Sequence, residues 1–582
     1  MILRYLRMLS NSVAAAALAA GYIVVLVLQL NPSIPLTPRG IFPVLVSLGT
    51  FYVVQLTLIF YVALVVRQIL SSETHSPAWV SIGVIVWLGA AASAAGAALM
   101  WGNLRTFAPV LEPPIRIEIV RSMVTMVVAS MLFVAVALAR AQVGPRARMW
   151  NALIVAAIAT MSILVPLALR GRGSWPVLEA RPIDAAADFG SAERSARVTL
   201  LALDAASLDF ITSAAAEGRL PNFGRILDAG SVMHLATIHP TSPEAVWAAV
   251  ATGKLPQKNG VRSAGIYHMV PGGSIELLPD YCLAHDLVRL GFLSEEAHTS
   301  ATLRARALWS ILSAFHISVG VVGWSLTYPA PEVLGYVVSD SYHRSGSRSP
   351  DIDAGRLAYP RELPLDAALA TDGGGADDPD VVPVSSLDPR FGAPGRTDRV
   401  YDQIAQTMGV AHPTQVTIVR YQSLDPIGHY YLRYAMPSEF GDVSDEERRR
   451  LGLVLDRHYS FIDTAIGRAM ATLGPDDLLL VVSGYGMKPL SPSKRLLEKA
   501  IGDPDLSGTH DGAPDGFLMA YGAPVAKGRL PVQGWVVDVV PTVLYFLGLP
   551  VGRDMDGYAR TDMFQRSFTE EHPITFIPTY DR

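Results

Sequence analysis

The stretch Val198-Thr-Leu-Leu-Ala-Leu-Asp204 decides the fold of the larger part of this chain, because it is an almost continuous apolar run that ends in an acid. Such runs are typical of strands buried on both faces of a parallel sheet. Similar runs follow at 318–324, 416–421 and 477–483, and helical patterns lie between them at 208–217, 244–251, 302–315 and 445–472. This alternation predicts an α/β domain that binds its ligands at the carboxyl ends of the strands.

The chain upstream of this domain is strongly apolar. Of the 582 residues, 50% are hydrophobic and 17% are charged, a balance that excludes disorder for most of the chain. Five stretches lack Asp, Glu, Lys and Arg, namely 12–30, 42–66, 78–101, 122–139 and 152–169. Each is long enough to cross a hydrocarbon core about 30 Å thick. We therefore expect five transmembrane helices, since buried helices of a soluble domain would need polar residues on one face of some of them.

Arginines in the loops predict the orientation of these helices. With the N-terminus inside, six lie on the cytoplasmic side (Arg4, Arg7, Arg67, Arg140, Arg146 and Arg148) and four on the outer side (Arg39, Arg105, Arg116 and Arg121). Because the number of spans is odd, the soluble part then lies outside. We expect an integral protein of a bacterial inner or plasma membrane, with its soluble domain in a periplasm or on an extracellular face.

Composition also predicts where the domains begin and end. We expect a membrane domain at 1–170, a linker containing Gly, Pro and Arg at 171–196, and a soluble domain at 197–582. Within the last, residues 364–397 are rich in Gly, Asp and Pro and predict an irregular surface loop.

The soluble part is acidic. The net charge of the whole chain is −5 and that of residues 1–195 is +7, which leaves −12 for residues 196–582. Nucleic acid is therefore excluded as a structural partner, because binding a phosphate backbone needs a basic surface. The chain has one cysteine, Cys282, which excludes a disulfide framework and a multi-cysteine metal site.

Residues suited to chemistry occur at the first strand end and at one helix start. Asp204 could cap the following helix or bind a metal. The segment His239-Pro-Thr241-Ser242-Pro-Glu244 leads into a predicted helix, and Thr241 with Glu244 fits a capping box. A hydroxyl at this position is equally well placed to attack phosphorus, because free backbone N–H groups and the helix dipole favour phosphate oxygens. A metal would then have to activate it.

Two further motifs predict a metal site. Asp425-Pro-Ile-Gly-His429 follows the predicted strand at 416–421, and His510 lies in the glycine-rich loop Gly508-Thr-His510-Asp-Gly. An acid and a histidine four residues apart can converge on one ion, and both residue types suit zinc. Asp425, His429 and His510 thus form a candidate mononuclear site, the alternative being surface or hydrogen-bonded histidines.

The order of these motifs resembles the alkaline phosphatase superfamily, and within it the type I phosphodiesterases and nucleotide pyrophosphatases. The resemblance rests on an acid at the first strand end, T-x-P before a helix that ends in Thr252-Gly253, D-x-x-G-H, and G-T-H followed by D-G, and it covers residues 198–560. It implies an alkaline-phosphatase-like α/β domain with a mostly parallel sheet and helices on both faces. It also implies a metal-dependent phosphodiesterase, phosphohydrolase or phosphotransferase that binds zinc.

The resemblance further implies two metal ions and a covalent phosphothreonine or phosphoserine. One ion would be held by Asp425, His429 and His510. The other would be held by Asp204, the nucleophile and an Asp-His pair. The nucleophile corresponds to Thr241, with Ser242 as its rival because the spacing to Thr252-Gly253 is longer than usual in the family.

This chain departs from the pattern at the second ion. Ser483-Gly484-Tyr485-Gly-Met487 stands where the Asp-His pair is expected, so both of those side chains are missing. Three explanations stay open: catalysis with one metal, ligands from elsewhere, or a decayed enzyme. The nearest residues in sequence that could compensate are Asp511, Asp515, Tyr485 and Lys488.

The sequence thus predicts a membrane-anchored phosphodiesterase or phosphotransferase that uses a threonine nucleophile and one or two zinc ions. Its substrate would be an envelope or nucleotide phosphodiester. Five spans before a phosphatase-like domain resemble the architecture of phosphoethanolamine and phosphoglycerol transferases of bacterial envelopes, which favours a lipid-linked substrate. The alternative is a catalytically impaired relative that acts as a binding or regulatory module.

Overall fold

The structure is a computed structural model that describes residues 2–71, 78–143, 148–170, 195–270, 272–279, 284–344, 353–363, 395–501, 503–510, 512 and 514–581. The chain forms two compact units, one of Met1–Glu179 with Gly265–Ala297 and one of Ala180–Ala264 with His298–Arg582. Most of the predicted linker and residues 364–394 of the predicted loop lie outside the described residues. The bounds of the three predicted segments stay predictions.

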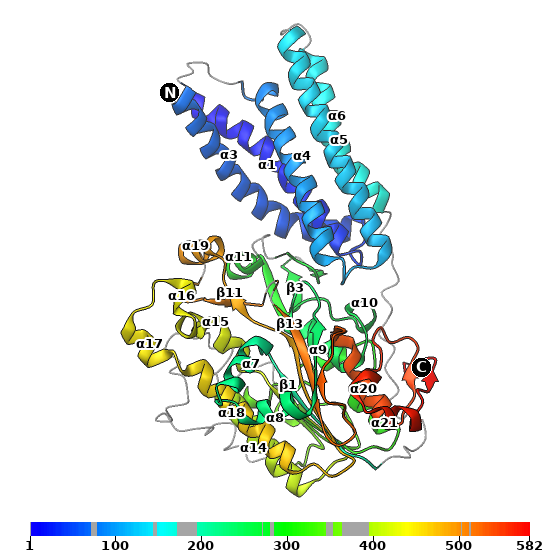
Figure 1. Cartoon of the computed structure of the whole chain (residues 1–582). Coiled ribbons are helices and arrows are strands. Elements are labelled where there is room, and N and C mark those ends of the chain that lie inside the picture. The colour runs from blue at the N-terminus through cyan, green and yellow to red at the C-terminus, as the bar shows by residue number, and fades with distance from the viewer. Residues whose placement is uncertain are drawn as a thin grey trace. The chain divides into compact units, whose positions relative to one another are not determined.

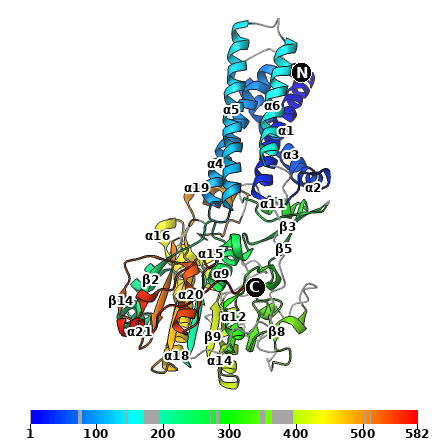
Figure 2. The ribbon, with the colours of Figure 1, turned by 90° about the vertical axis from the view of Figure 1, so that its right-hand side faces the viewer.

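The first unit contains the apolar helices (Figures 1 and 2). Five helices are long and apolar enough to cross a membrane: Ile2–Leu30 (α1), Pro38–Leu70, Ile82–Phe107 (α4), Pro113–Ala139 and Trp150–Arg170. The second comprises α2 (Pro38–Val44), η1 (Leu45–Gly49) and α3 (Thr50–Ser71), and the last two belong to α5 (Pro113–Val143) and α6 (Arg148–Arg170). The number of such helices agrees with the prediction. Helix α1 is the most buried, and its Tyr22 hydroxyl lies 2.8 Å from the hydroxyls of Ser93 and Ser162.

An excursion of the chain, Gly265–Ala297, belongs to the same unit. It forms the antiparallel sheet β4-β3-β5 and one helix, with β3 at Gly265–Met269, β4 at Ser274–Ile275, α11 at Ala284–Arg289 and β5 at Leu293–Ala297. Its buried apolar residues share one cluster with residues of α1, α2, η1 and α3. Asn31, which follows α1, accepts hydrogen bonds from the backbone N–H groups of Glu276 and Leu277, each at 2.9 Å. The sequence did not predict this excursion.

A ten-stranded mixed sheet forms the core of the second unit. Its order is β14 (Gly528–Arg529), β2 (Ser231–Ala236), β13 (Asp515–Tyr521), β10 (Leu478–Tyr485), β1 (Val198–Leu203), β9 (Val416–Tyr421), β6 (Val319–Val322), β7 (Gly335–Val338) and β8 (Ala358–Tyr359), and β15 (Gly534–Trp535) pairs with β2. The central strands β10, β1, β9, β6 and β7 are parallel, and β13 and β8 run antiparallel to their neighbours. The four predicted apolar runs therefore form four of these five central strands, and β7 is the fifth.

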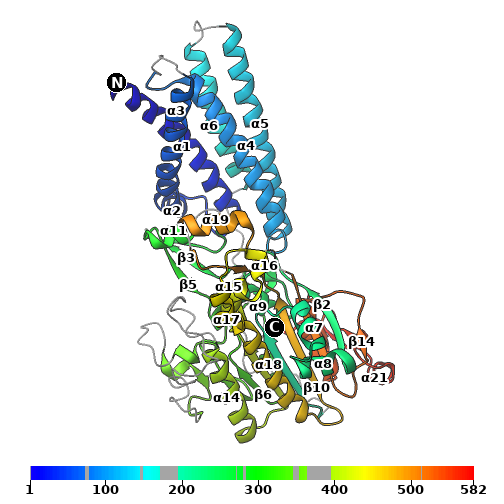
Figure 3. The same cartoon turned by 60° about the vertical axis from the view of Figure 1, so that its left-hand side comes forward.

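Helices lie on both faces of the sheet (Figures 2 and 3). One face carries α7 (Leu208–Ala216), α8 (Pro221–Ala229), α14 (Arg396–Ala411), α15 (Leu424–Ala435) and α18 (Val454–Ala471), which share a buried cluster with β1, β9 and β10. The other carries α9 (Pro243–Thr252), α12 (Leu308–Ala314) and α20 (Val539–Phe546). The shorter elements are α10 (Pro256–Asn259), α16 (Pro437–Phe440), α17 (Asp445–Leu451), α19 (Pro492–Ile501), α21 (Arg566–Glu571), β11 (Lys488–Pro489), β12 (Gly508–Thr509), β16 (Val551–Gly552) and β17 (Phe576–Ile577).

Two predicted helices differ from the structure. The pattern at 302–315 gives a helix only from Leu308, and the one at 445–472 is divided into α17 and α18 at Gly452, because glycine weakens a helix interior. The five parallel strands all end at one edge of the sheet. There Asp204 follows β1, Asp340 follows β7, and Tyr485 ends β10.

Candidate active site

Helix α15 positions two of the predicted metal ligands. Asp425 lies in its first turn and His429 follows one turn later, so both side chains project from the same face. The Oδ2 atom of Asp425 lies 3.7 Å from the Nε2 atom of His429. The helix thus presents one oxygen and one nitrogen donor side by side.

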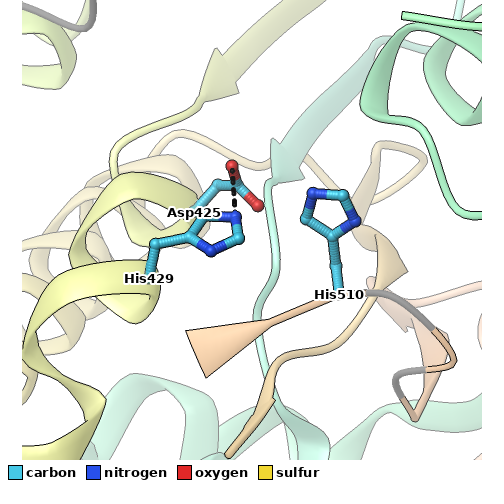
Figure 4. A group of neighbouring side chains, drawn as sticks. All are labelled: Asp425, His429 and His510. Carbon is cyan, nitrogen blue, oxygen red and sulfur yellow. Dashed lines mark ion pairs between the residues drawn. The ribbon is translucent and has the colours of Figure 1, made fainter. Parts of the chain in front are cut away.

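His510 completes the group from a different element (Figure 4). It directly follows β12, whose Gly508 and Thr509 pair with β11. Its ring centroid lies 5.2 Å from that of His429. One ligand atom from each of Asp425, His429 and His510 lies within 4.8 Å of the other two, so the structure brings the three predicted residues together. Their role as ligands stays a prediction.

A hydrogen bond fixes the orientation of the His429 ring. Its Nδ1 lies 2.9 Å from the carbonyl oxygen of Gly508, and since a carbonyl only accepts, Nδ1 carries the proton. The lone pair of Nε2 is then directed toward Asp425, an arrangement that metal-binding histidines commonly show. The backbone N–H and the hydroxyl of Ser507 both donate to the carbonyl oxygen of His429, at 2.6 and 2.9 Å, and join the loop to α15.

The three residues fit a divalent ion. Two imidazole nitrogens and a carboxylate oxygen are a donor set that suits zinc. The Oδ1 atom of Asp425 is buried and accepts no hydrogen bond within the described part of the chain. A bound cation would satisfy this oxygen, which otherwise costs free energy.

The hydroxyl groups of Thr241 and Ser242 lie between β2 and α9. Thr241 is buried, and its Oγ1 lies 3.2 Å from Nδ1 of His239. Ser242 is the N-cap of α9 and donates to Oε2 of Glu244 at 2.8 Å instead of capping the helix. The capping box proposed for Thr241 and Glu244 is therefore wrong, because the helix begins one residue later and Glu244 binds Ser242. Both candidate nucleophiles have an acceptor within hydrogen-bonding distance.

Asp204 lies in an ion pair. Arg420, near the end of β9, donates from Nε to Oδ1 of Asp204 at 2.8 Å and from Nη2 to Oδ2 at 2.5 Å. Both side chains are buried, with 7% of the Arg420 side chain and 3% of the Asp204 side chain exposed. Burial alone would lower the pKa of Arg420, but the Asp204 carboxylate outweighs this and raises that pKa above its ordinary value. That Asp204 also binds a metal stays a prediction.

Burial raises the pKa of three carboxyl groups around Arg420. The pKa is raised to about 6 for Asp204, to about 7 for Glu244 and to about 6 for Asp340. In each case the positive charge of Arg420 opposes the rise. The positive charge of Arg420 thus favours the ionised form of all three carboxyl groups.

The residues that could replace the missing Asp-His pair lie in other contacts or outside the described residues. The ring of Tyr485 lies 5.5 Å from that of His510, and its side chain is buried. Lys488 donates to the carbonyl oxygen of Gly512, and Asp515 accepts from the Thr237 backbone and the Gln533 side chain. Asp511 lies outside the described residues. In the described chain, one group of three acidic or histidine side chains is close enough to share an ion, and it is the group above.

The sequence motifs assign no role to Arg420 or His239. A signal for Arg420 was present, since a cation inside the apolar run 416–421 must have a buried anion nearby. The contact of His239 with Thr241 depends on a turn whose backbone cannot be derived from the sequence pattern.

Comparison with known proteins gives a match in sequence and a similarity in structure. A family model described as type I phosphodiesterase / nucleotide pyrophosphatase matches residues 198–527, more than half of the chain. No curated protein sequence matches the chain. Two solved structures of murine ectonucleotide pyrophosphatase / phosphodiesterase 5 are similar, and one is an inactive variant in complex with AMP. Both are 12% identical, with TM-scores of 0.39 and 0.38, and the matches cover 64% and 63% of this chain and 100% of each of those chains.

Proposed function

The chain belongs to the type I phosphodiesterase / nucleotide pyrophosphatase family, and from this premise we propose that it is a membrane-anchored, metal-dependent phosphodiesterase or phosphotransferase. Its fold is the alkaline-phosphatase-like α/β fold that the sequence predicts, preceded by five apolar helices. The single observation that carries the proposal is the group of Asp425, His429 and His510, whose ligand atoms lie within 4.8 Å of one another.

Asp425, His429 and His510 would hold a zinc ion at the carboxyl edge of the sheet. When bound there, a divalent ion supplies positive charge that stabilises the phosphoryl group during transfer. The protein's own part is to fix the three ligands, and the Gly508 carbonyl keeps the Nε2 atom of His429 unprotonated for this purpose.

Thr241 is the proposed nucleophile, and His239 its base. In the tautomer with a proton on Nε2, His239 accepts from the Thr241 hydroxyl through Nδ1 at 3.2 Å. As Oγ1 of Thr241 bonds to phosphorus, its proton passes to Nδ1 and the bond from phosphorus to the leaving oxygen breaks. Nδ1 then gives this proton to the leaving oxygen, which departs as a hydroxyl group. Water, or an acceptor hydroxyl in a transferase, next attacks phosphorus and gives its proton to Nδ1, the bond from phosphorus to Oγ1 breaks, and Nδ1 returns the proton to Oγ1.

Ser242 is the rival nucleophile, because Glu244 accepts from its hydroxyl at 2.8 Å and is a suitable base. Thr241 is preferred for its place in the T-x-P pattern. The substrate class proposed is a phosphodiester, either lipid-linked or a nucleotide. The five apolar helices favour a lipid-linked one, with the α/β domain on the outer side of the membrane.

The experiment measures hydrolysis of bis(p-nitrophenyl) phosphate by the full chain in detergent, with zinc or manganese supplied. We expect turnover that His510→Ala and Thr241→Ala each lower by at least about 10²-fold, with Ser242→Ala much closer to the unmodified chain. His412→Ala, at the exposed end of α14, is the matched control and should keep full activity. Digestion after brief exposure to substrate should show the mass of a p-nitrophenyl phosphoryl group on the peptide that contains Thr241, because one ester of the diester stays on phosphorus.

Two outcomes would contradict the proposal. Full activity in Thr241→Ala with loss in Ser242→Ala would move the nucleophile to Ser242. A folded, metal-bound chain that turns over neither this diester nor a nucleotide diester would instead support the binding or regulatory module, for which the missing Asp-His pair at Gly484 and Tyr485 is the specific observation.

A further inference from the structure

Arg420 is buried in the layer between the sheet and α9. It is the penultimate residue of β9, opposite Ala202 of β1, and its neighbour Tyr421 contributes to the apolar cluster on the opposite face. The guanidinium carbon lies 5.7 Å from the ring centroid of Trp247 in α9, and Trp247 packs edge-on against Trp324 at 5.2 Å. Strand and aromatic contacts together hold the cation in one place.

Within the described part of the chain, Asp204 is the one acidic residue that forms an ion pair with Arg420. Both oxygens of Asp204 accept from the guanidinium, at 2.8 and 2.5 Å. A carboxylate engaged in this bidentate way has its in-plane lone pairs occupied, so it is a poor ligand for an additional ion. The Nη1 atom of Arg420 makes no hydrogen bond in the described chain and can donate to a further acceptor.

The packing around β10 leaves no room for a side chain at position 484, the first of the two positions where the Asp-His pair is expected. A Cβ atom on Gly484 would lie 2.4 Å from Cγ1 of Val246, so any side chain there requires Val246 to move. The following residue, Tyr485, is fully buried and contributes a ring and a phenol hydroxyl. Its hydroxyl makes no hydrogen bond among the described residues.

We infer that the guanidinium of Arg420 takes the place of a second metal ion, so that the site consists of one divalent ion and one fixed organic cation. The inference rests on the proposed function for the role of the site, but the number of ions is independent of activity. An arginine stays charged at every pH at which the protein is folded and cannot be removed by a chelator. Its free Nη1 donor would bind an oxygen of an anionic group such as a phosphodiester.

The first test counts ions. Full chain in detergent is saturated with zinc, freed of excess ion by gel filtration, and analysed by elemental mass spectrometry. We expect one zinc per chain, none in His510→Ala, and one in Asp204→Asn, because Asp204 holds Arg420 and no ion. Two ions per chain, with one lost in Asp204→Asn, would overturn the inference whatever the activity.

The second test asks whether the positive charge matters. Arg420→Ala should keep one zinc and lower turnover of bis(p-nitrophenyl) phosphate by about 10²- to 10³-fold, as removal of a charge-stabilising donor does. Added guanidinium chloride at millimolar concentration should restore part of that loss in Arg420→Ala. Arg468→Ala, which breaks an Arg–Asp pair with Asp402, is the matched control and should show no such rescue.

The results separate this inference from the proposed function. A chain that binds one zinc but is inactive on all diesters refutes the proposed function and leaves the ion count intact. If the Arg420→Ala variant binds one zinc and is fully active, the proposed role of Arg420 is refuted and the phosphodiesterase proposal is unaffected. Loss of turnover in Arg420→Ala without any response to guanidinium would also contradict the proposed role of Arg420, provided that circular dichroism shows the variant to be folded.

Discussion

The backbone of Gly508 lies so close to Gly428 that a Cβ atom at position 508 would be 2.3 Å from the Gly428 carbonyl oxygen. The two glycines belong to the motifs that carry His429 and His510. Their close approach lets the Gly508 carbonyl accept from Nδ1 of His429 at 2.9 Å. The glycines of both motifs therefore have a physical function, which is to let the loop and α15 meet.

Gly508→Ala should disrupt the metal group without removing a ligand. Because the new Cβ atom would meet a backbone carbonyl oxygen, β12 must move away from α15 and carry His510 with it. We expect zinc affinity to fall at least about tenfold, the size of effect seen when the partners of metal ligands are disturbed. Isothermal titration calorimetry measures the affinity. Gly409→Ala in α14 is the control, since nothing lies within 4 Å of a Cβ atom there, and an equal loss in that variant would contradict the explanation.

The Asp204–Arg420 pair should show strong coupling in stability. Arg420→Met alone leaves a buried carboxylate without its cation, which typically costs about 3–5 kcal/mol. Replacing both partners, Asp204→Asn with Arg420→Met, should recover much of this loss, because no charge then remains unpaired. Thermal unfolding of the full chain in detergent, followed by intrinsic fluorescence, gives the melting temperatures. Additive losses from the two substitutions would mean that the residues do not depend on each other.

His239→Gln should slow the chemical step more than binding. Glutamine has a similar length but is no base, so the Thr241 hydroxyl would keep a polar neighbour and lose its proton acceptor. We expect kcat to fall about 10²- to 10⁴-fold, the usual contribution of general acid–base catalysis, with KM changed little. Steady-state kinetics with bis(p-nitrophenyl) phosphate measure both constants. A change confined to KM would show that His239 binds substrate and takes no proton.

Much of the fold follows from the sequence pattern. Apolar runs at 198–204, 416–421 and 477–483 gave central strands because parallel strands buried on both faces need no polar residue. The uncharged stretches gave helices long enough for a membrane because their length is set by the thickness of the hydrocarbon core. The proximity of Asp425 and His429 could be predicted because α15 places them one turn apart. His510 lies close to both, as predicted, although it follows β12 of a separate two-stranded sheet, and the role of the three residues as metal ligands stays a prediction.

Other features could not be predicted because they depend on tertiary contacts. The excursion Gly265–Ala297 has strands and a helix, as an α/β domain does. Nothing in its pattern of polar and apolar residues indicates that it packs against α1. The sequence motifs predicted Asp204 as a helix cap or a metal ligand and not as a partner of Arg420, because Arg420 is 216 residues away and is brought close by the pairing of β1 with β9. Proximity in sequence favoured Lys488 as a residue that could compensate for the missing Asp-His pair, but Lys488 donates to the Gly512 carbonyl oxygen instead.

Asn31→Leu should release the excursion from the helices of its own unit. The Asn31 side chain accepts from Glu276 and Leu277 and donates to the Leu277 carbonyl at 2.8 Å, so leucine of similar size would leave three backbone groups unpaired. We expect faster amide exchange over 272–279, by at least about tenfold for the loss of roughly 1.5 kcal/mol or more. Hydrogen–deuterium exchange mass spectrometry measures this. Exchange unchanged in 272–279 would show that apolar packing alone holds the excursion.

Asp340→Asn should stabilise the protein above pH 6 and have little effect near pH 4. Burial raises the pKa of Asp340 to about 6, above the value of about 3.9 expected in an unfolded chain, so between these values the folded state binds more protons. Stability then falls as the pH rises through this window and stays lower above it.

Asparagine does not ionise, and its amide oxygen can still accept from the Leu326 N–H, which in the unmodified chain donates to Asp340 at 3.0 Å. We expect the melting temperature of Asp340→Asn to exceed that of the unmodified chain at pH 7.5, by an amount that corresponds to about 1 kcal/mol or more, and the difference at pH 4.5 to be about a third as large. Fluorescence-monitored melting at both pH values measures the difference. A gain that is equal at both pH values would show that the gain does not come from the ionisation of Asp340. A loss at pH 7.5 would show that the Asp340 carboxylate is stabilised by Arg420 more than it is destabilised by burial.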